Sequence, residues 1–253
     1  MSAMFVSHAS MGTPVVGDNN AEGCPVRRAQ HWPRGRDVHV WTIDLAAPAA
    51  GPADWLDRRE LERAHRFVYA HDSTRYVRAH LALRAILGAY LGREPAALNF
   101  VERELGKPRL LPEGGECHFN LSHSKDKAMV VVGAADEVGV DIEAVRDDLP
   151  GEDLASAVLC EDEMKQLASF PEGERAQPFV TCWTRKEACL KALGLGLSLQ
   201  PRNLHVGFGL ARKRLTVAGC DLDIEALPVP AGYRAAVAAL GGLGQVHMFD
   251  LHS

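Results

Sequence analysis

One uninterrupted helical segment, residues 179–194, constrains the fold of this 253-residue chain more than any other stretch. It contains no proline and no glycine before its last residue, Gly194, which is a favourable residue for ending a helix. Pro178, immediately before it, suits the first turn of a helix. The segment therefore predicts a helix around which the second half of the chain is packed.

Polar and aromatic side chains share one face of this predicted helix. Trp183, Glu187 and Lys191 are four residues apart, so they lie one above the other, and Lys186 lies next to them. One interpretation is a solvent-exposed ion pair between Glu187 and Lys191, which contributes about 0.2–0.5 kcal/mol. The other is a functional site, and it requires a second acidic cluster that shares a metal ion with Glu187. Trp183 is predicted to pack and hold the helix in place.

Residues 138–145 supply that second cluster. They form a predicted strand in which Asp141 and Glu143 point to one side, while Ile142 points to the other side and into a core. Two carboxylates this close repel each other unless a cation lies between them, either a Lys or Arg side chain or a divalent ion. With Glu187 nearby, three carboxylates would suit Mg²⁺, with water and phosphate as further ligands. Adjacent lysines bind phosphate groups.

The most basic part of the chain lies in two predicted helices, one within residues 54–70 and one that ends near residue 91. Asp72 or Ser73 is predicted to cap the second helix. The basic residues are either a solvated helix face or a wall that binds anions. They are Arg63, His65, Arg66, Arg75, Arg78 and Arg84.

Alternating and apolar segments predict strands in both halves. Before the central helix they cover residues 38–45, 98–104, 118–123, 127–133 and 138–145, and a short helix covers 160–170. After it, residues 204–208, 214–217, 233–239 and 246–249 predict an antiparallel meander. We therefore expect an α+β fold of two similar halves, residues 37–138 and 139–253, each a small antiparallel sheet with packed helices. Residues 1–36 are expected to form a poorly ordered or covering leader.

Composition excludes several classes of function. The net charge is −5 and the pI about 6.1, so no overall basic field favours nucleic acid or an anionic membrane. No stretch is apolar for the roughly 20 residues that a membrane-spanning helix needs. The six cysteines form no Cys-x-x-Cys pair and fit no zinc spacing, which predicts free thiols and a cytoplasmic protein. Cys182 and Cys189 are expected to pack as small apolar groups.

Four motifs now occur in a recognisable order: Gly106-Lys-Pro108, Phe119-Asn-Leu-Ser-His-Ser124, Gly139-Val-Asp-Ile-Glu143, and Trp183-x-x-Lys-Glu-x-x-x-Lys191. Their order and spacing resemble the 4′-phosphopantetheinyl transferases, in particular the monomeric, two-half type that serves peptide and polyketide synthetases. The resemblance covers about residues 38–249. It implies transfer of the phosphopantetheine arm of coenzyme A to a serine of an acyl or peptidyl carrier protein, with release of adenosine 3′,5′-bisphosphate.

The resemblance also implies roles for individual residues. Asp141, Glu143 and Glu187 would hold Mg²⁺, or alternatively Mn²⁺, on the pyrophosphate, and Glu187 or a water would accept the serine proton. Lys191 would neutralise the leaving phosphate. The other residues that the resemblance places on coenzyme A are Arg63, Arg66, Arg75, Lys107, Pro108, Ser122, His123 and Lys186.

Some of these residues also have simpler interpretations. His123 and Ser122 could be ordinary turn residues, and Lys107 could be exposed beside its proline. At the level of the whole protein, the alternatives are a module that binds carrier protein or coenzyme A without transfer, and a Mg²⁺-dependent phosphohydrolase.

Overall fold

The computed structural model describes residues 31–102, 106–111, 117–146, 152–194 and 198–251. The chain has an α+β fold, as predicted, and its elements follow in this order. The first part contains β1 (Val38–Asp44), α1 (Arg58–His65), α2 (Ala70–Leu91), β2 (Asn99–Glu102), β3 (Pro108–Leu111), β4 (His118–Ser124) and β5 (Lys127–Gly133). The second part contains β6 (Val138–Ala144), α3 (Glu152–Val158), α4 (Glu161–Ala168), α5 (Ala176–Leu193), β7 (Lys213–Val217), β8 (Cys220–Leu227), β9 (Tyr233–Leu240) and β10 (Val246–Leu251). Short 3-10 turns cover Ala53–Trp55, Pro95–Ala97, Glu172–Glu174 and Pro201–Asn203.

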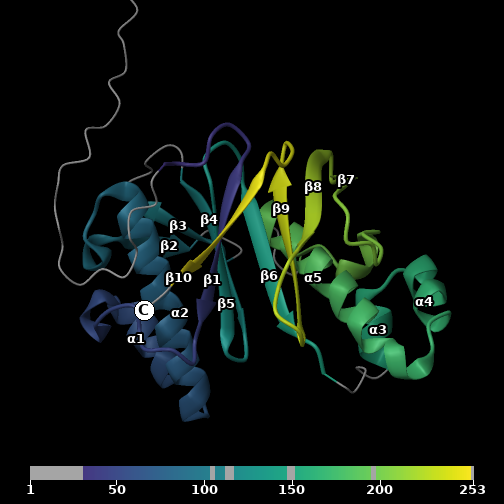
Figure 1. The fold of residues 1–253 in the computed structure, drawn as a ribbon, viewed down its shortest axis with the longest axis horizontal. Coiled ribbons are helices and arrows are strands. Elements are labelled where there is room, and N and C mark those ends of the chain that lie inside the picture. Colours follow the sequence, from purple (N-terminus) through teal and green to yellow (C-terminus); the bar gives the residue numbers. More distant parts are fainter. Residues whose placement is uncertain (1–30, 103–105, 112–116, 147–151, 195–197, 252–253) are drawn as a thin grey trace, which may run out of the picture.

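Two four-stranded sheets lie side by side at the centre of the molecule, with helices on their outer sides (Figure 1). The strand orders are β10-β1-β5-β4 and β6-β9-β8-β7, and β2 and β3 form a separate pair. Helices α1 and α2 lie beside the first sheet, and α3, α4 and α5 beside the second. The edge strands β4 and β6 therefore meet where the two sheets meet.

Strand alternation divides the core into three clusters. In β5, Val130 and Val132 pack with α2, whereas Met129 and Val131 pack against the second sheet. In β9, Ala236 and Ala238 pack with α5, while alternate residues join the cluster between the sheets. Each central strand is thus buried on both faces, which explains its nearly continuous apolar sequence.

The last strand corrects the predicted meander. β10 does not continue the second sheet but pairs in parallel with β1, from Val38 opposite Val246 to Ile43 opposite Leu251. The predicted strand at residues 204–208 is absent, and β8 was not predicted. A short apolar run does not reveal its pairing partner, because pairing is decided by distant parts of the chain. The division at residues 138 and 139 remains an expectation, and most of the expected leader lies outside the described residues.

The ends of the helices agree only in part with the predictions. Helix α5 ends before Gly194, which has φ 65° and caps it as expected. Helix α2 starts earlier than predicted. Its N-cap residue is Tyr69, which makes no side-chain capping bond. Ser73 lies inside the first turn and donates to the carbonyl of Ala64. Helix α3 was not predicted.

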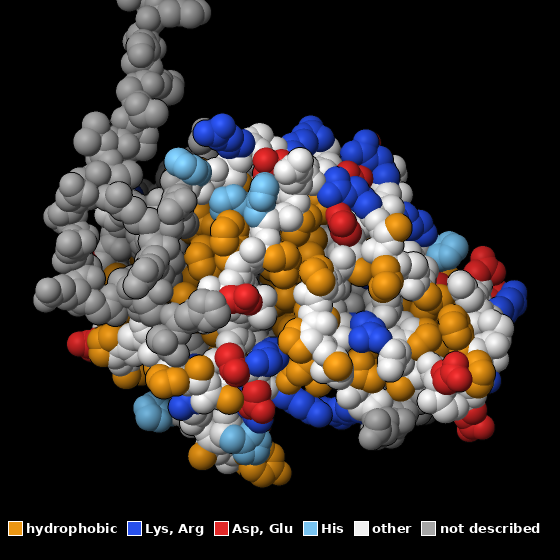
Figure 2. Space-filling model, in the orientation of Figure 1, with side chains coloured by type: hydrophobic (Ala, Val, Ile, Leu, Met, Phe, Trp, Pro, Cys, Tyr) orange, Lys and Arg blue, Asp and Glu red, His pale blue; other side chains and the backbone are white. Residues whose placement is uncertain are grey.

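The cysteines and the surface agree with the composition. The five cysteines in the described part of the chain are free, and Cys182 and Cys189 are fully buried, as predicted. The face in Figure 2 carries both signs of charge among hydrophobic side chains, with Lys and Arg gathered along its upper rim. In the described part of the chain, no helix is both long and apolar enough to cross a membrane.

Candidate active site

The site is built on β6, whose side chains alternate as predicted. Val140 and Ile142 are fully buried between the sheets. Asp141 and Glu143 point to the opposite side, and Asp141 is only 2% exposed. The predicted carboxylate pair therefore exists on one face of a rigid strand, where the protein withdraws it from water.

Gly139 lets α5 lie directly against this strand. A Cβ atom at this position would be 2.2 Å from the carbonyl oxygen of Ala188 and 2.4 Å from the nitrogen of Ala192, both backbone atoms of α5. Only glycine permits this approach without a shift of the helix. The close packing places Lys191 of α5 over Asp141 of β6.

Lys191 makes three hydrogen bonds at the centre of the site. Its ammonium group donates to Oδ1 of Asp141 (2.6 Å), Oγ of Ser122 (3.0 Å) and the carbonyl of Val140 (3.3 Å). Lys191 is therefore paired with Asp141 across two elements, and the exposed ion pair with Glu187 that we considered is not the arrangement found.

The carboxylates repel one another. Burial raises the pKa of Glu143, and the negative charge of Asp141 raises it further. Burial likewise raises the pKa of Glu187, and the charges of Asp141 and Glu143 act in the same direction, against Lys191. These shifts have the sign expected when anions share a desolvated site.

The donor set fits a divalent cation. Oδ2 of Asp141 is buried and has no hydrogen-bond partner, a costly state for a carboxylate oxygen. Oxygen ligands from three carboxylates are the kind that Mg²⁺ and Mn²⁺ accept. A cation bound here would give Oδ2 a partner and reduce the repulsion that raises the pKa values of Glu143 and Glu187.

A second group of possible metal ligands lies elsewhere. Within the described ranges, ligand atoms of Cys160, Glu163 and His205 lie within 4.8 Å of one another. They are closer together than the carboxylate oxygens of Asp141, Glu143 and Glu187. Glu163, however, already accepts four hydrogen bonds: from the backbone nitrogens of Cys160, Val206 and Gly207, and from an ammonium group. Its carboxylate has no lone pair left for a metal.

That ammonium group belongs to Lys186, and its position corrects a prediction. Lys186 is fully buried, lies 2.5 Å from Glu163, and donates to the carbonyls of Pro201 and Leu204. Burial alone would raise the pKa of Glu163, but the bond from Lys186, with the backbone donors, lowers it to about 2. Lys186 therefore does not hold pyrophosphate, because its ammonium group is fixed in the core beneath α5.

Several predicted basic residues are gathered near Lys191. His123 reaches solvent at the end of β4, yet desolvation and the charges of Lys191, Arg75 and Arg63 lower its pKa. Arg75 is tied to Asp126 (2.8 Å) and Asp72 (3.3 Å). The positive charges of Lys191, Arg75 and Arg63 near His123 are suited to an anionic ligand.

The other predicted contacts are more varied. Arg66 is the exposed C-cap residue of α1. Lys107 is buried, not exposed, and donates to Glu137 (2.6 Å) and to the carbonyl of Val138 (2.9 Å). Pro108 begins β3. Ser122 is neither exposed nor an ordinary turn residue, because its hydroxyl donates to Asp141 (2.8 Å).

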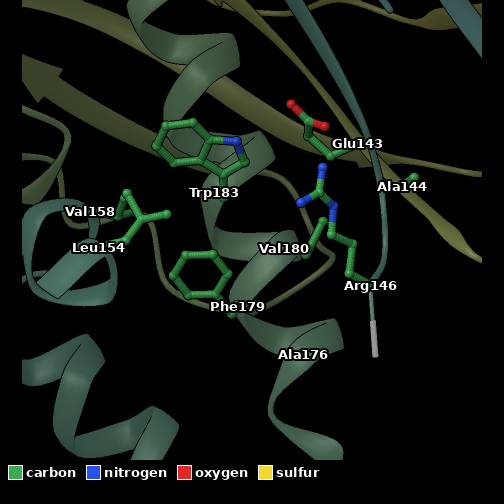
Figure 3. A pocket seen from close by; sticks show the side chains of 9 residues that line it. All are labelled: Glu143, Ala144, Arg146, Leu154, Val158, Ala176, Phe179, Val180 and Trp183. Atoms are coloured by element: carbon green, nitrogen blue, oxygen red, sulfur yellow. The ribbon is translucent and has the colours of Figure 1, made fainter. Parts of the chain in front are cut away.

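An open pocket of about 250 Å³ adjoins Glu143, and the sequence analysis did not predict it (Figure 3). Aromatic and aliphatic side chains of α3 and α5 form one wall, and Glu143 and Arg146 form the polar end. The indole of Trp183 lines the pocket beside Glu143 and opposes the rise in the pKa of that carboxyl, so this residue does more than pack. The four-residue spacing of Phe179 and Trp183 was the sequence feature that could have indicated this pocket. The lining residues are Glu143, Ala144, Arg146, Leu154, Val158, Ala176, Phe179, Val180 and Trp183.

Comparison with known proteins agrees with this geometry. A family model described as the 4′-phosphopantetheinyl transferase superfamily matches residues 137–237, which include β6 and α5. The chain is 36% identical over 167 residues to the 4′-phosphopantetheinyl transferase HetI of Nostoc sp., covering 64% of this chain and 70% of the relative. It is 30% identical over 190 residues to the 4′-phosphopantetheinyl transferase ffp of Bacillus subtilis, covering 73% and 82%. AcpT of Escherichia coli is 36% identical over 149 residues, covering 59% and 72%.

This chain belongs to the 4′-phosphopantetheinyl transferase superfamily, as the resemblance of its motifs implied. Within that superfamily it is an enzyme, a 4′-phosphopantetheinyl transferase that modifies carrier proteins.

Proposed function

We propose that the enzyme takes phosphopantetheine from coenzyme A, in a reaction that depends on Mg²⁺ or Mn²⁺ and releases adenosine 3′,5′-bisphosphate. The observation that carries this proposal is the meeting of Asp141, Glu143, Glu187 and Lys191 at one site, where a buried oxygen of Asp141 has no partner. A protein that only binds coenzyme A has no need of this set. Asp141, Glu143 and Glu187 would hold the ion, which supplies a Lewis acid for the pyrophosphate.

The chain's own residues account for the proton and the leaving group. Glu187, whose pKa is raised by burial and neighbouring charge, accepts the proton of the carrier serine directly or through a water. The serine oxygen forms a bond to the phosphorus that bears pantetheine, and the bond from that phosphorus to the bridging oxygen breaks. Lys191, which binds Asp141 at the acidic cluster, would neutralise the charge left on the departing bisphosphate.

Coenzyme A would lie between the basic residues and the pocket. Arg75 and Arg63, whose charges act on His123, would form a cationic wall for its phosphates. Ser122, which binds Lys191, and the predicted contacts Arg66, Lys107 and Pro108 would complete the set that the motif resemblance implies. We place the pantetheine arm in the pocket beside Glu143, because that pocket is lined mainly by apolar side chains and opens at the acidic cluster. We further propose that the enzyme works as a monomer in the cytoplasm, where coenzyme A and carrier proteins occur.

Mass spectrometry of intact carrier protein tests the proposal. An unmodified carrier protein is incubated with the enzyme, coenzyme A and Mg²⁺, and in parallel with EDTA. A gain of one phosphopantetheine mass that disappears in EDTA is expected. A gain that persists in EDTA, even after the enzyme has been treated with chelator, would refute the metal requirement. No gain with several carrier classes, while coenzyme A still binds, would favour a binding module.

A further inference from the structure

Side chains of β4 join the two sheets. Strands β4 and β6 are neighbouring edges of different sheets, so they share no backbone ladder. Three backbone N–H groups of β6 donate instead to side-chain oxygens of β4. The nitrogens of Val140, Ile142 and Ala144 donate to Asn120 (3.0 Å), Ser122 (3.4 Å) and Ser124 (3.1 Å), respectively. The acceptors are two residues apart, as alternation in a strand requires.

The two serines make a second bond that the asparagine does not. Ser122 donates its hydroxyl proton to Oδ1 of Asp141 (2.8 Å), and Ser124 donates its proton to Oε2 of Glu143 (2.8 Å). A hydroxyl has one proton and two lone pairs, so each serine can accept from β6 and donate to a carboxylate at once. Asn120 accepts from Val140, and the residue of β6 that precedes Val140 is Gly139, which has no carboxylate.

We propose that Ser124 is a positioning residue that holds the Glu143 carboxylate in place for the divalent cation. Glu143 has a flexible side chain, and the charges of Asp141 and Glu187 push it away from the site. The bond from Ser124 opposes this repulsion and fixes one oxygen, and the carboxylate keeps lone pairs for a metal. Ser124 therefore prepares the site before any ion binds. The inference rests on the proposed metal-dependent function.

Ser124 could also matter only as a link between the sheets. The two roles are separable, because Asn120 makes the same link without touching a carboxylate. Loss of the link alone should lower the stability of the protein but not its affinity for a cation. Loss of the carboxylate contact should lower the affinity.

Binding of Mn²⁺ to the free full-length protein, followed by electron paramagnetic resonance, tests the proposal. Ser124→Ala should weaken Mn²⁺ binding by about tenfold or more, as for other groups that orient metal ligands. Ser124→Thr keeps the hydroxyl and should bind within about threefold of the wild type. Asn120→Ala should lower the melting temperature yet bind Mn²⁺ like the wild type. In transfer assays, Ser124→Ala should need more Mg²⁺ but recover most of its turnover at saturating Mg²⁺.

Asp141→Ala separates the two possible failures. If it loses Mn²⁺ binding while Ser124→Ala retains wild-type affinity, the role of Ser124 is refuted and the metal site stands. The same conclusion follows if Ser124→Thr is as weak as Ser124→Ala. If Asp141→Ala binds Mn²⁺ like the wild type, or the wild type binds none, both the metal site and the role of Ser124 are refuted.

Discussion

At the scale of single residues, Glu187 is the group on which turnover depends most directly. Its replacement by glutamine keeps the shape but removes the charge and the basicity. We expect Glu187→Gln to fold normally, with an unchanged or higher melting temperature because three repelling carboxylates become two. Turnover should fall by roughly 10²–10⁴-fold, the usual contribution of a general base. Initial rates by mass spectrometry and thermal unfolding measure the two effects.

An exposed acid provides the control for this variant. Glu172→Gln, in the 3-10 turn before α5, removes the same charge without contact with the site and should leave turnover unchanged. Near-normal transfer by Glu187→Gln would show that this carboxylate has been misassigned.

His80 of α2 should make stability depend on pH. Burial lowers its pKa to about 4, from an ordinary value of 6.5, and its Nδ1 donates to the carbonyl of Tyr76. Between these values the unfolded chain takes up the proton first, so the stabilising contribution is complete above pH 6.5 and is lost as the pH falls towards 4. The loss is at most about 3.5 kcal/mol, from about 1.4 kcal/mol for each unit of pKa between 6.5 and about 4.

Urea unfolding between pH 7 and pH 4 measures this effect. His80→Gln keeps a donor for the carbonyl but cannot titrate, so its free energy of unfolding should fall less on acidification than that of the wild type. His71→Gln, at an exposed position of the same helix, is the control. Equal pH dependence in His80→Gln and the wild type would contradict the assignment.

At the scale of elements, the contact between β6 and α5 should tolerate no side chain at Gly139. A methyl group there would overlap backbone atoms of α5, and overpacking costs about 1–3 kcal/mol or more. Gly139→Ala should therefore lower the melting temperature by several degrees, at roughly 2–4 °C per kcal/mol for a chain of this size. It should also reduce turnover, since Lys191 would move away from Asp141.

Gly173→Ala is the matched control, because a Cβ atom at that exposed glycine meets nothing within 4 Å. Calorimetry and transfer assays should find it close to the wild type. If Gly139→Ala were equally harmless, the close contact of the strand and the helix would not be needed to form the site.

The buried ion pair between α4 and α5 gives an element-scale prediction about stability. Lys186→Met would leave the Glu163 carboxylate buried and without its cation, which typically costs about 3–5 kcal/mol. Lys165→Met breaks an exposed pair with Glu161 and should have little effect. Chemical denaturation compares the two. A Lys186→Met protein as stable as Lys165→Met would contradict the structural role assigned to Lys186.

At the scale of the whole molecule, β10 connects the end of the chain to the first sheet. The segment after β9 leaves the second sheet and pairs with β1, where Phe249 stacks on Trp41 with ring centroids 4.9 Å apart. A chain that ends at Gln245 would leave the edge of β1 open. It should unfold at a lower temperature than the full chain, because the first sheet loses a strand.

Tryptophan fluorescence and circular dichroism during heating measure this change. Phe249→Leu removes the ring stacking but keeps the strand, so it should be intermediate between the truncated and the full chain. An unchanged melting temperature after truncation would mean that β10 adds nothing to the stability of the first sheet.

Local periodicity was enough to predict the parts of the site that lie within one element. Alternation put Asp141 and Glu143 on one side of β6 with Ile142 in the core, as observed. The end of α5 was predicted at Gly194, because glycine adopts positive φ without strain. The four-residue spacing put Glu187 and Lys191 on one helix face, and Lys191 does reach the acidic cluster.

The sequence by itself thus determined the fold class, the carboxylate pair and the face of α5 that meets it, since these follow from spacings of two and four residues. Only the tertiary structure decided which partner each side chain has. Lys186 lies next to Glu187 in sequence, but successive residues of a helix point about 100° apart. The Lys186 ammonium group therefore pairs with the buried Glu163 of α4. The partner of β10 and the serine bonds between the sheets were likewise set by packing between distant segments, which no local period encodes.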